Sequence, residues 1–373
     1  MTQRIRLYIF WGIVPFFIQA CHEKVPDQVV EDVVFNLESY DNEDVESTKY
    51  TDLQFIPLDN ARECLLSHVS RLKVTDAGYY ILNDAEYPSV FLFNVDGTFS
   101  HKVGGVGRSK SEYLNIMDIA ANDRGDAVAI MTLSDLKQYD ANGKFISSYP
   151  FKERQRWENV LYTPKGFVCS RNYRGTDCLV AMYDKGFTSI QKIVLTDEAV
   201  VTGEPPYADN ILQNDDKYLC YMDMFNSRFY VSEWKDLSHP HCYMLKSERM
   251  MTLNNVQEKG RDYIYSYILA DHVIKGRMLY KDDSRGFEIN LDDNTFRFCD
   301  EKGLFVSFMD YKDGYYYSIV TPMDLLHFMD DKITFLNHFT PSIDSLRVAF
   351  APYKESLSEK DNYYLLKMKI KRK

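Results

Sequence analysis

Two histidines separated by one residue could bind a metal ion. His239 and His241 flank Pro240, and this alternate spacing would allow two imidazoles to reach one ion. A closed zinc site needs four ligands, and no nearby cysteine or carboxylate cluster completes that set. We therefore interpret the segment as a loop with two histidines, and we predict neither a metal nor another cofactor.

The glycine-rich stretch Gly104–Gly107 could instead bind phosphate, because glycines let backbone amides approach an anion closely. Such a loop should open a helix. Here the residues that follow indicate further strands, so we interpret the stretch as a connection between two structural units.

Nucleophilic and zinc-hydrolase chemistry has no motif in this chain: Gly-x-Ser-x-Gly, His-Glu-x-x-His and a P-loop are all absent. The 55 Asp and Glu residues could include a glycosidase pair, but spacing alone does not identify two that meet. The residues on predicted loops that could line a ligand-binding face are Tyr87, Arg108, Glu112, Tyr113, Arg171, Tyr173 and Arg228.

The N-terminus predicts export and lipidation. Arg4 and Arg6 precede an apolar run over residues 7–18, which is shorter than the roughly 20 residues of a membrane-spanning helix. The run ends at Cys21, in a pattern typical of lipoprotein signals, so residues 1–20 are expected to be cleaved and Cys21 to carry the lipid. His22 in place of aspartate favours the outer membrane, on either side. An ordinary secretory signal is the alternative.

The other six cysteines are too sparse for a disulfide framework. Cys169 and Cys178 flank a predicted turn at residues 172–175. If that turn closes a hairpin, the two could face each other and form a disulfide. Two buried free thiols are the alternative.

Composition favours a β-rich globular protein. Tyr (28) and Phe (23) are abundant, both favour strands, and long helical periodicity is hard to find. The net charge of −11 argues against a nucleic-acid partner.

Turn signals recur along the chain. Asp-Gly or Asn-Gly turns at Gly97 and Gly143 are 46 residues apart, and a degenerate copy follows at Gly186. A second series precedes them at Gly78, Gly125 and Gly166. Two turn series in step, with a period in the forties, indicate a repeated four-stranded unit.

Such a unit cannot bury both faces alone, which predicts an all-β fold, a six-bladed β-propeller with four-stranded antiparallel blades. Further blades are expected over residues 211–245, 263–298 and 303–320. The strands at residues 53–58 and 363–370 are expected to close the ring. Residues 51–373 then form the propeller, and residues 21–50 an acidic tether.

The segment from Leu53 to Phe151 resembles the six-bladed β-propeller lipoproteins of Gram-negative bacteria, relatives in architecture of NHL-repeat propellers. The resemblance rests on an entry strand ending in Pro57-Leu58, and on Gly105, Gly107, Glu112 and Tyr113 of an inter-blade motif. The Pro-Gly step typical of that motif is replaced by polar residues. The resemblance implies the fold and a cell-envelope location, and no common activity.

Two functional hypotheses follow. The first is a lipid-anchored, non-enzymatic binding module for a glycan, a peptide or an envelope protein, and a glycan-uptake complex is one setting in which it could act. The second is a carbohydrate-active hydrolase or lyase with its site in the central funnel. His, Arg and two carboxylates at that mouth would favour the enzyme, and a neutral aromatic surface would favour binding.

Overall fold

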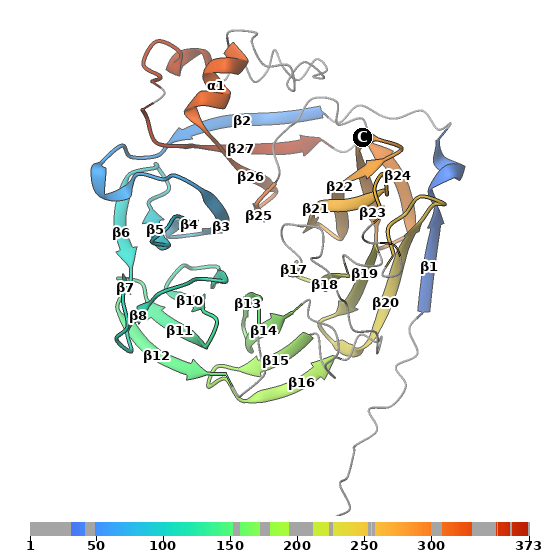
Figure 1. Cartoon of the computed structure of the whole chain (residues 1–373), viewed down its shortest axis with the longest axis horizontal. Coiled ribbons are helices and arrows are strands. Elements are labelled where there is room, and N and C mark those ends of the chain that lie inside the picture. The colour runs from blue at the N-terminus through green and yellow to red at the C-terminus, as the bar shows by residue number, and fades with distance from the viewer. Residues whose placement is uncertain are drawn as a thin grey trace, which may run out of the picture.

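Short segments rich in Val, Ile, Tyr and Phe form the strands of this chain, because such side chains fit a pleated, half-buried surface. In the computed structural model these strands build six blades around one axis (Figure 1), so the predicted six-bladed β-propeller is confirmed. The structure describes residues 31–41, 49–151, 157–171, 180–193, 212–223, 227–252, 255, 258–299, 308–329, 348, 350–358 and 360–371.

Each of the first three blades is a meander of four antiparallel strands. The first blade contains β3 (Val69–Thr75), β4 (Gly78–Asn83), β5 (Ser89–Phe93) and β6 (Phe99–Val103). The second contains β9 (Asp118–Ala121), β10 (Ala127–Met131), β11 (Asp135–Asp140) and β12 (Phe145–Pro150). The third contains β13 (Asn159–Thr163), β14 (Gly166–Ser170), β15 (Val180–Asp184) and β16 (Ser189–Ile193).

The other three blades follow the same plan. The fourth contains β17 (Leu212–Asn214), β18 (Tyr218–Asp223), β19 (Arg228–Glu233) and β20 (Asp236–Lys246). The fifth contains β21 (Tyr263–Ala270), β22 (Val273–Tyr280), β23 (Asp283–Asn290) and β24 (Thr295–Cys299). The sixth contains β25 (Asp310–Lys312), β26 (Tyr315–Val320), β27 (Tyr364–Lys371) and β2 (Lys49–Pro57).

The sixth blade closes the ring. Its outer strand β2 comes from the N-terminal part of the chain and pairs antiparallel with β27 near the C-terminus, as the sequence predicts. The first strands of consecutive blades contact one another all the way around, including β25 with β3. Each blade therefore has a neighbouring blade on both sides.

The two sides of the ring differ. The side we call the hairpin face carries the turns between first and second strands and between third and fourth strands; the loop face carries the other connections, including those from blade to blade. Gly78 and Gly166 lie at equivalent places on the hairpin face, with φ of +139° and +144°. A Cβ at either would overlap a backbone carbonyl of the third strand, which explains this turn series.

The hydrophobic core lies between neighbouring blades. Tyr80 and Leu92 of the first blade, for example, pack with Ile119 and Val128 of the second. Leu365 of β27 packs toward the first blade, whereas Leu366 packs toward Ile268 of the fifth. Each blade is therefore stabilised mainly by its two neighbours.

The segment expected to be a tether contains part of the propeller. β1 (Glu31–Asn36) adds a fifth strand to the fourth blade, in parallel with β20, and the 3₁₀ helix η1 (Leu37–Tyr40) follows. The sequence did not predict this strand, because its few hydrophobic residues are surrounded by acidic ones. Within the expected tether, residues 21–30 and 42–48 lie outside the described residues.

Helices contribute little to the described part of the chain. The helix α1 (Pro322–Met329) follows β26, while η2 (Arg62–Cys64) and η3 (Ala351–Tyr353) lie in connections. The short β7 (Gly105–Val106) and β8 (Glu112–Tyr113) pair between the first two blades. Among the described residues, no helix has the length and apolarity to cross a membrane.

Candidate functional site

The residues predicted to line a ligand face differ in their exposure. Tyr87 and Arg108 are exposed on connections of the loop face. Arg228 begins β19 and is half-buried. Arg171 is buried, and its guanidinium lies 5.2 Å from the ring of Trp157. Tyr173 lies outside the described residues.

The glycine-rich stretch is an inter-blade connection, as predicted, and its acidic residue holds the connection together. A carboxylate oxygen of Glu112 accepts a hydrogen bond from the Ser109 amide at 2.9 Å. Tyr113 does not line the loop face: its side chain is buried, and its hydroxyl donates to the Val103 carbonyl at 2.8 Å. Both residues therefore have structural partners in place of a ligand.

The two histidines lie in a strand, and the predicted loop is wrong. His239 and His241 belong to β20, where the pairing with β19 shifts register and both side chains are exposed. His239 Nδ1 lies 2.9 Å from Asp236.

Cys169 is a free, buried thiol. Its cross-strand neighbour on β15 is Ala181, so the strands do not have the register that a Cys169–Cys178 pair assumed. The connection is longer than a tight turn, since β14 ends at Ser170 and β15 begins at Val180. Cys178 lies outside the described residues.

A cavity of about 570 Å³ lies at the mouth of the central channel on the hairpin face. The turns between the first and second strands of the second to sixth blades surround it. Three aromatic side chains, Tyr162, Trp234 and Tyr311, contribute to its wall. This volume is in the range typical of small-molecule sites.

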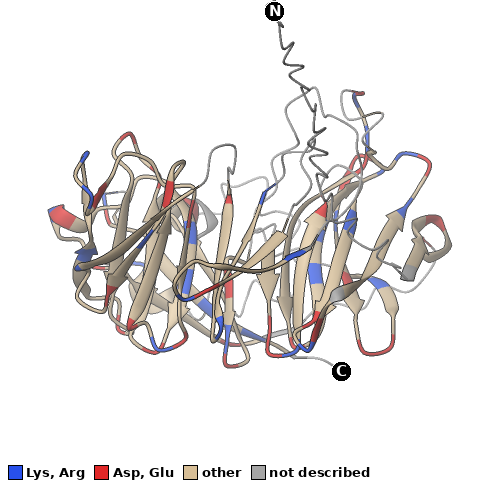
Figure 2. Ribbon diagram, turned by 90° about the horizontal axis from the view of Figure 1, so that it is seen from below, with Lys and Arg blue, Asp and Glu red and all other residues tan. Residues whose placement is uncertain are grey.

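Charged residues line the same cavity. Its carboxylates are Asp123, Asp215, Asp216, Asp271 and Asp313, and its ammonium groups are Lys165 and Lys312. In the side view of Figure 2, acidic residues recur at the turns along the edge from which the C-terminus emerges. The mouth is therefore predominantly acidic.

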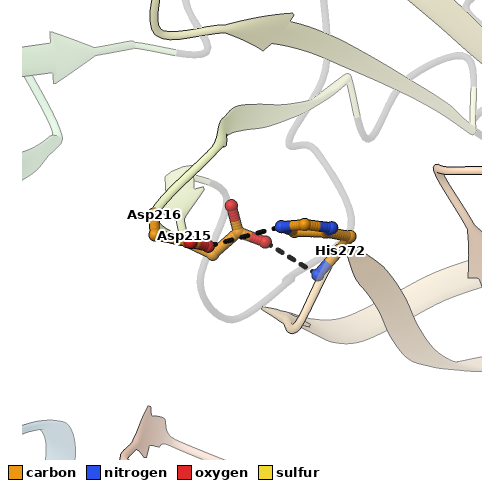
Figure 3. Close-up of side chains that lie close together, drawn as sticks. All are labelled: Asp215, Asp216 and His272. Carbon is orange, nitrogen blue, oxygen red and sulfur yellow. Dashed lines mark hydrogen bonds and ion pairs between the residues drawn. The ribbon is translucent and has the colours of Figure 1, made fainter.

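Not all of these carboxylates are available to a ligand. Asp215 Oδ1 accepts hydrogen bonds from the backbone amides of Lys217 and Tyr218, at 2.9 and 2.7 Å. Its Oδ2 accepts the amide of His272 in the next blade at 2.9 Å (Figure 3). Asp215 thus shapes its own turn and joins the fourth blade to the fifth.

Asp215, Asp216 and His272 also lie near enough together to share a metal ion, with candidate ligand atoms within 4.8 Å of one another. The imidazole already has acidic neighbours: Nε2 is 3.4 Å from Asp216, and Nδ1 is 3.0 Å from Asp292. The hydrogen bond to Asp292 raises the pKa of His272, with the charges of Asp215 and Asp216 contributing. A protonated imidazole is a poor metal ligand.

Asp292 completes this network at the rim. The Lys217 ammonium, 2.9 Å away, and the His272 ring together lower the pKa of Asp292 to about 2. These contacts link the fourth blade to the turn between β23 and β24. Surface pairs of this kind chiefly orient side chains.

The sequence interpretation missed this mouth. It placed further blades over residues 211–245, 263–298 and 303–320, but it assigned no ligand-binding role to the acidic side chains of the turns within them. The available signal was positional, because Asp123, Asp215, Asp271 and Asp313 occupy the same turn in the second, fourth, fifth and sixth blades. The aromatic residues carry no such signal, since Tyr is abundant throughout.

The closed ring of meander blades and the axial cavity define this protein as a six-bladed β-propeller. The family model described as a domain of unknown function (DUF4934) matches residues 32–369. The chain therefore belongs to the DUF4934 family, and the match begins within β1.

Two solved structures share the fold. A candidate exported protein from Bacteroides fragilis has a TM-score of 0.64 at 14% identity, covering 92% of this chain and 100% of that one. A member of the DUF4221 family from Bacteroides vulgatus has a TM-score of 0.54 at 10% identity, covering 88% and 99%. No curated protein matched the chain.

Proposed function

We propose that this protein is an exported, non-enzymatic binding module whose ligand occupies the cavity on the hairpin face. The observation that carries the proposal is the cavity itself: about 570 Å³ on the axis, with aromatic and carboxylate side chains from several blades. Concave sites of this size, in which polar groups converge from several elements, are typical of ligand binding. The rigid ring would hold these groups in place before the ligand arrives.

The composition of the mouth bears on the enzymatic alternative. A histidine and carboxylates do gather there, which is part of what a funnel hydrolase would need. However, Asp215 is engaged by three backbone amides, and His272 contacts acidic groups on both ring nitrogens. A general acid or base needs a proton-transfer position open to substrate. Binding is therefore the better-supported function.

The proposed location is the cell envelope, with a lipid on Cys21 as anchor in the manner of the lipoprotein propellers that the chain resembles. The N-terminal signal pattern supports this, as does the candidate exported protein of similar fold. Because β1 begins at Glu31, nine residues, 22–30, lie between Cys21 and the propeller. Fully extended, the chain from Cys21 to Glu31 would reach about 35 Å. A role in a glycan-uptake complex would suit such a short anchor.

The test is calorimetric titration of the protein beginning at residue 22 with neutral, acidic and amino-bearing oligosaccharides and short peptides. Lys165 is exposed at the cavity, so Lys165→Trp should obstruct it and weaken binding by about tenfold or more. Arg108→Trp places the same bulk on the loop face and should leave affinity unchanged.

Loss of binding in Arg108→Trp but not in Lys165→Trp would contradict the proposal and place the ligand on the loop face. The absence of binding across the whole panel would also contradict it. Turnover of any oligosaccharide would establish the hydrolase or lyase instead.

A further inference from the structure

We infer that the cavity selects ligands that carry a protonated amine, with an amino sugar as the favoured source. This rests on the proposed function and adds the chemical class of the ligand. The observation is the combination, in one cavity, of five carboxylates and three aromatic side chains with two ammonium groups.

The charge balance of the cavity favours cations over anions. The ammonium of Lys312 already has partners, because it lies 2.9 Å from Asp76 and 3.3 Å from the Asp123 carbonyl. Its positive charge is therefore largely neutralised by Asp76, which is not one of the five cavity carboxylates. Both partners lie on the hairpin face, in the turns of the first and second blades. Lys165 is thus the one ammonium in the described lining for which the structure gives no acidic partner. A site with this excess of negative charge attracts cations.

Carboxylates are exposed at the rim, where an incoming amine would meet them. Asp313 and Asp216 come from different blades, and the carboxylate of Asp216 is 88% exposed. Asp313 has φ of +52° and is followed by Gly314 at +79°, so a tight turn fixes its backbone. Charge-assisted hydrogen bonds from an ammonium to such groups are stronger than neutral ones.

The aromatic side chains supply the second half of the recognition. Trp234 Nε1 donates to the Asp215 carbonyl at 2.9 Å, which fixes the indole. Tyr162 packs edge-on against Phe167, with ring centroids 5.0 Å apart, and Tyr311 packs on Tyr316 at 4.9 Å. Rings held in this way can contact the apolar face of a sugar, and they also attract a cation.

A protonated amine could come from an amino sugar or from a lysine-containing peptide. The amino sugar suits the cavity better. The apolar faces of a sugar ring can contact the aromatic side chains, and its hydroxyls can donate hydrogen bonds to the carboxylates. The cavity volume also matches a short oligosaccharide. The experiment distinguishes the two sources.

The test compares the glucosamine trisaccharide with its fully N-acetylated counterpart, which has the same backbone and no charge. Trilysine and its acetylated form make a second pair. We expect the glucosamine trisaccharide to bind about tenfold more tightly than the N-acetylated form, and more tightly than trilysine, with affinity falling as salt increases.

The variant D216N/D313N should weaken glucosamine binding about tenfold and leave the N-acetylated form unaffected. The control D84N removes the same kind of charge from an exposed loop-face residue and should change neither. Folding of each variant is checked by its thermal transition.

Equal binding of the two trisaccharides, or no binding of either, would overturn the inference. The proposed function would survive if another panel ligand is still blocked by Lys165→Trp. Preference for trilysine would overturn the choice of amino sugar and retain the amine. The two failures are therefore distinguishable.

Discussion

At the scale of single residues, three carboxylates near the axis connect consecutive blades through backbone amides. Asp118 accepts the amide of Val160 at 2.9 Å, and Asp310 accepts that of Val74 at 2.6 Å. Asp215 does the same for His272. Burial raises the pKa of Asp310, with Lys73 nearby opposing that shift. These carboxylates therefore stabilise the ring by joining adjacent blades.

Replacing Asp118 should destabilise the protein markedly. Its carboxylate also accepts from Arg71 Nε at 3.0 Å and is only 7% exposed, so Asp118→Ala would leave the guanidinium and the Val160 amide without this acceptor. Breaking a buried pair in this way costs about 3 kcal/mol. Chemical denaturation should show this loss, whereas Arg124→Ala, at a pair with 77% and 47% exposed side chains, should change stability by less than about 0.5 kcal/mol. Equal effects would contradict the bridging role.

His272 should make stability depend on pH. Its pKa is raised in the folded protein, so the folded state holds the proton more tightly than the unfolded state. This stabilisation is complete below the ordinary pKa and disappears as pH rises through the raised value. His272→Asn tolerates the φ of +61° and removes the charge.

The loss should be no more than about 1 kcal/mol near pH 5.5, because the ion pairs of this half-buried imidazole lie at the solvated rim. It should shrink near pH 9, where the imidazole is neutral in both the folded and the unfolded state. Urea denaturation at both values measures it. A loss that grows with pH would show that the imidazole acts in its neutral form.

At the scale of elements, β1 shows how an added strand can stabilise a blade. Phe35 is buried and lies 5.4 Å from the ring of Phe296, in the fifth blade. Asp41, just after η1, accepts a hydrogen bond from Tyr280 at 3.2 Å. The N-terminal segment therefore fastens the outer edges of the fourth and fifth blades.

Phe35→Ala should lower the free energy of unfolding by about 3–5 kcal/mol, because it empties a buried aromatic position. Val34→Ala is a matched control: the neighbouring side chain points outward, is 46% exposed, and should have an effect within about 0.5 kcal/mol. Thermal and chemical denaturation compare the two. If Phe35→Ala behaved like the control, β1 would be dispensable to the fold.

The blades could be predicted because their turns have a local chemical signature. Gly78, Gly125 and Gly166 adopt backbone conformations that other residues avoid, so the repeat is visible in the sequence. β1 has no such turn, and its partner β20 is about 200 residues away, so nothing local reveals it. The cavity was missed for a similar reason, because its wall combines turns from five blades.

At the scale of the whole molecule, the ring depends on one strand near the C-terminus. β27 pairs with β26 on one side and with β2 on the other. Its alternating side chains face two different cores: Leu365 the first blade, and Leu366 and Met368 the fifth. A single strand therefore joins the ends of the chain and both flanking cores.

A chain ending at Asn362 should not complete the ring. It would lack Leu365, Leu366 and Met368, which are at most 1% exposed, and would leave β2 and β26 as unpaired edges. Losing each of these buried side chains costs about 2–5 kcal/mol of folding free energy. Together the three losses would remove most or all of the stability of a typical domain, which is about 5–15 kcal/mol. We expect no cooperative thermal transition, and aggregation through the open edges. A chain ending at Lys371 keeps all of β27 and should have the same melting temperature as the full-length protein. If the chain ending at Asn362 also unfolded cooperatively at that melting temperature, the blades would be stable without closure of the ring.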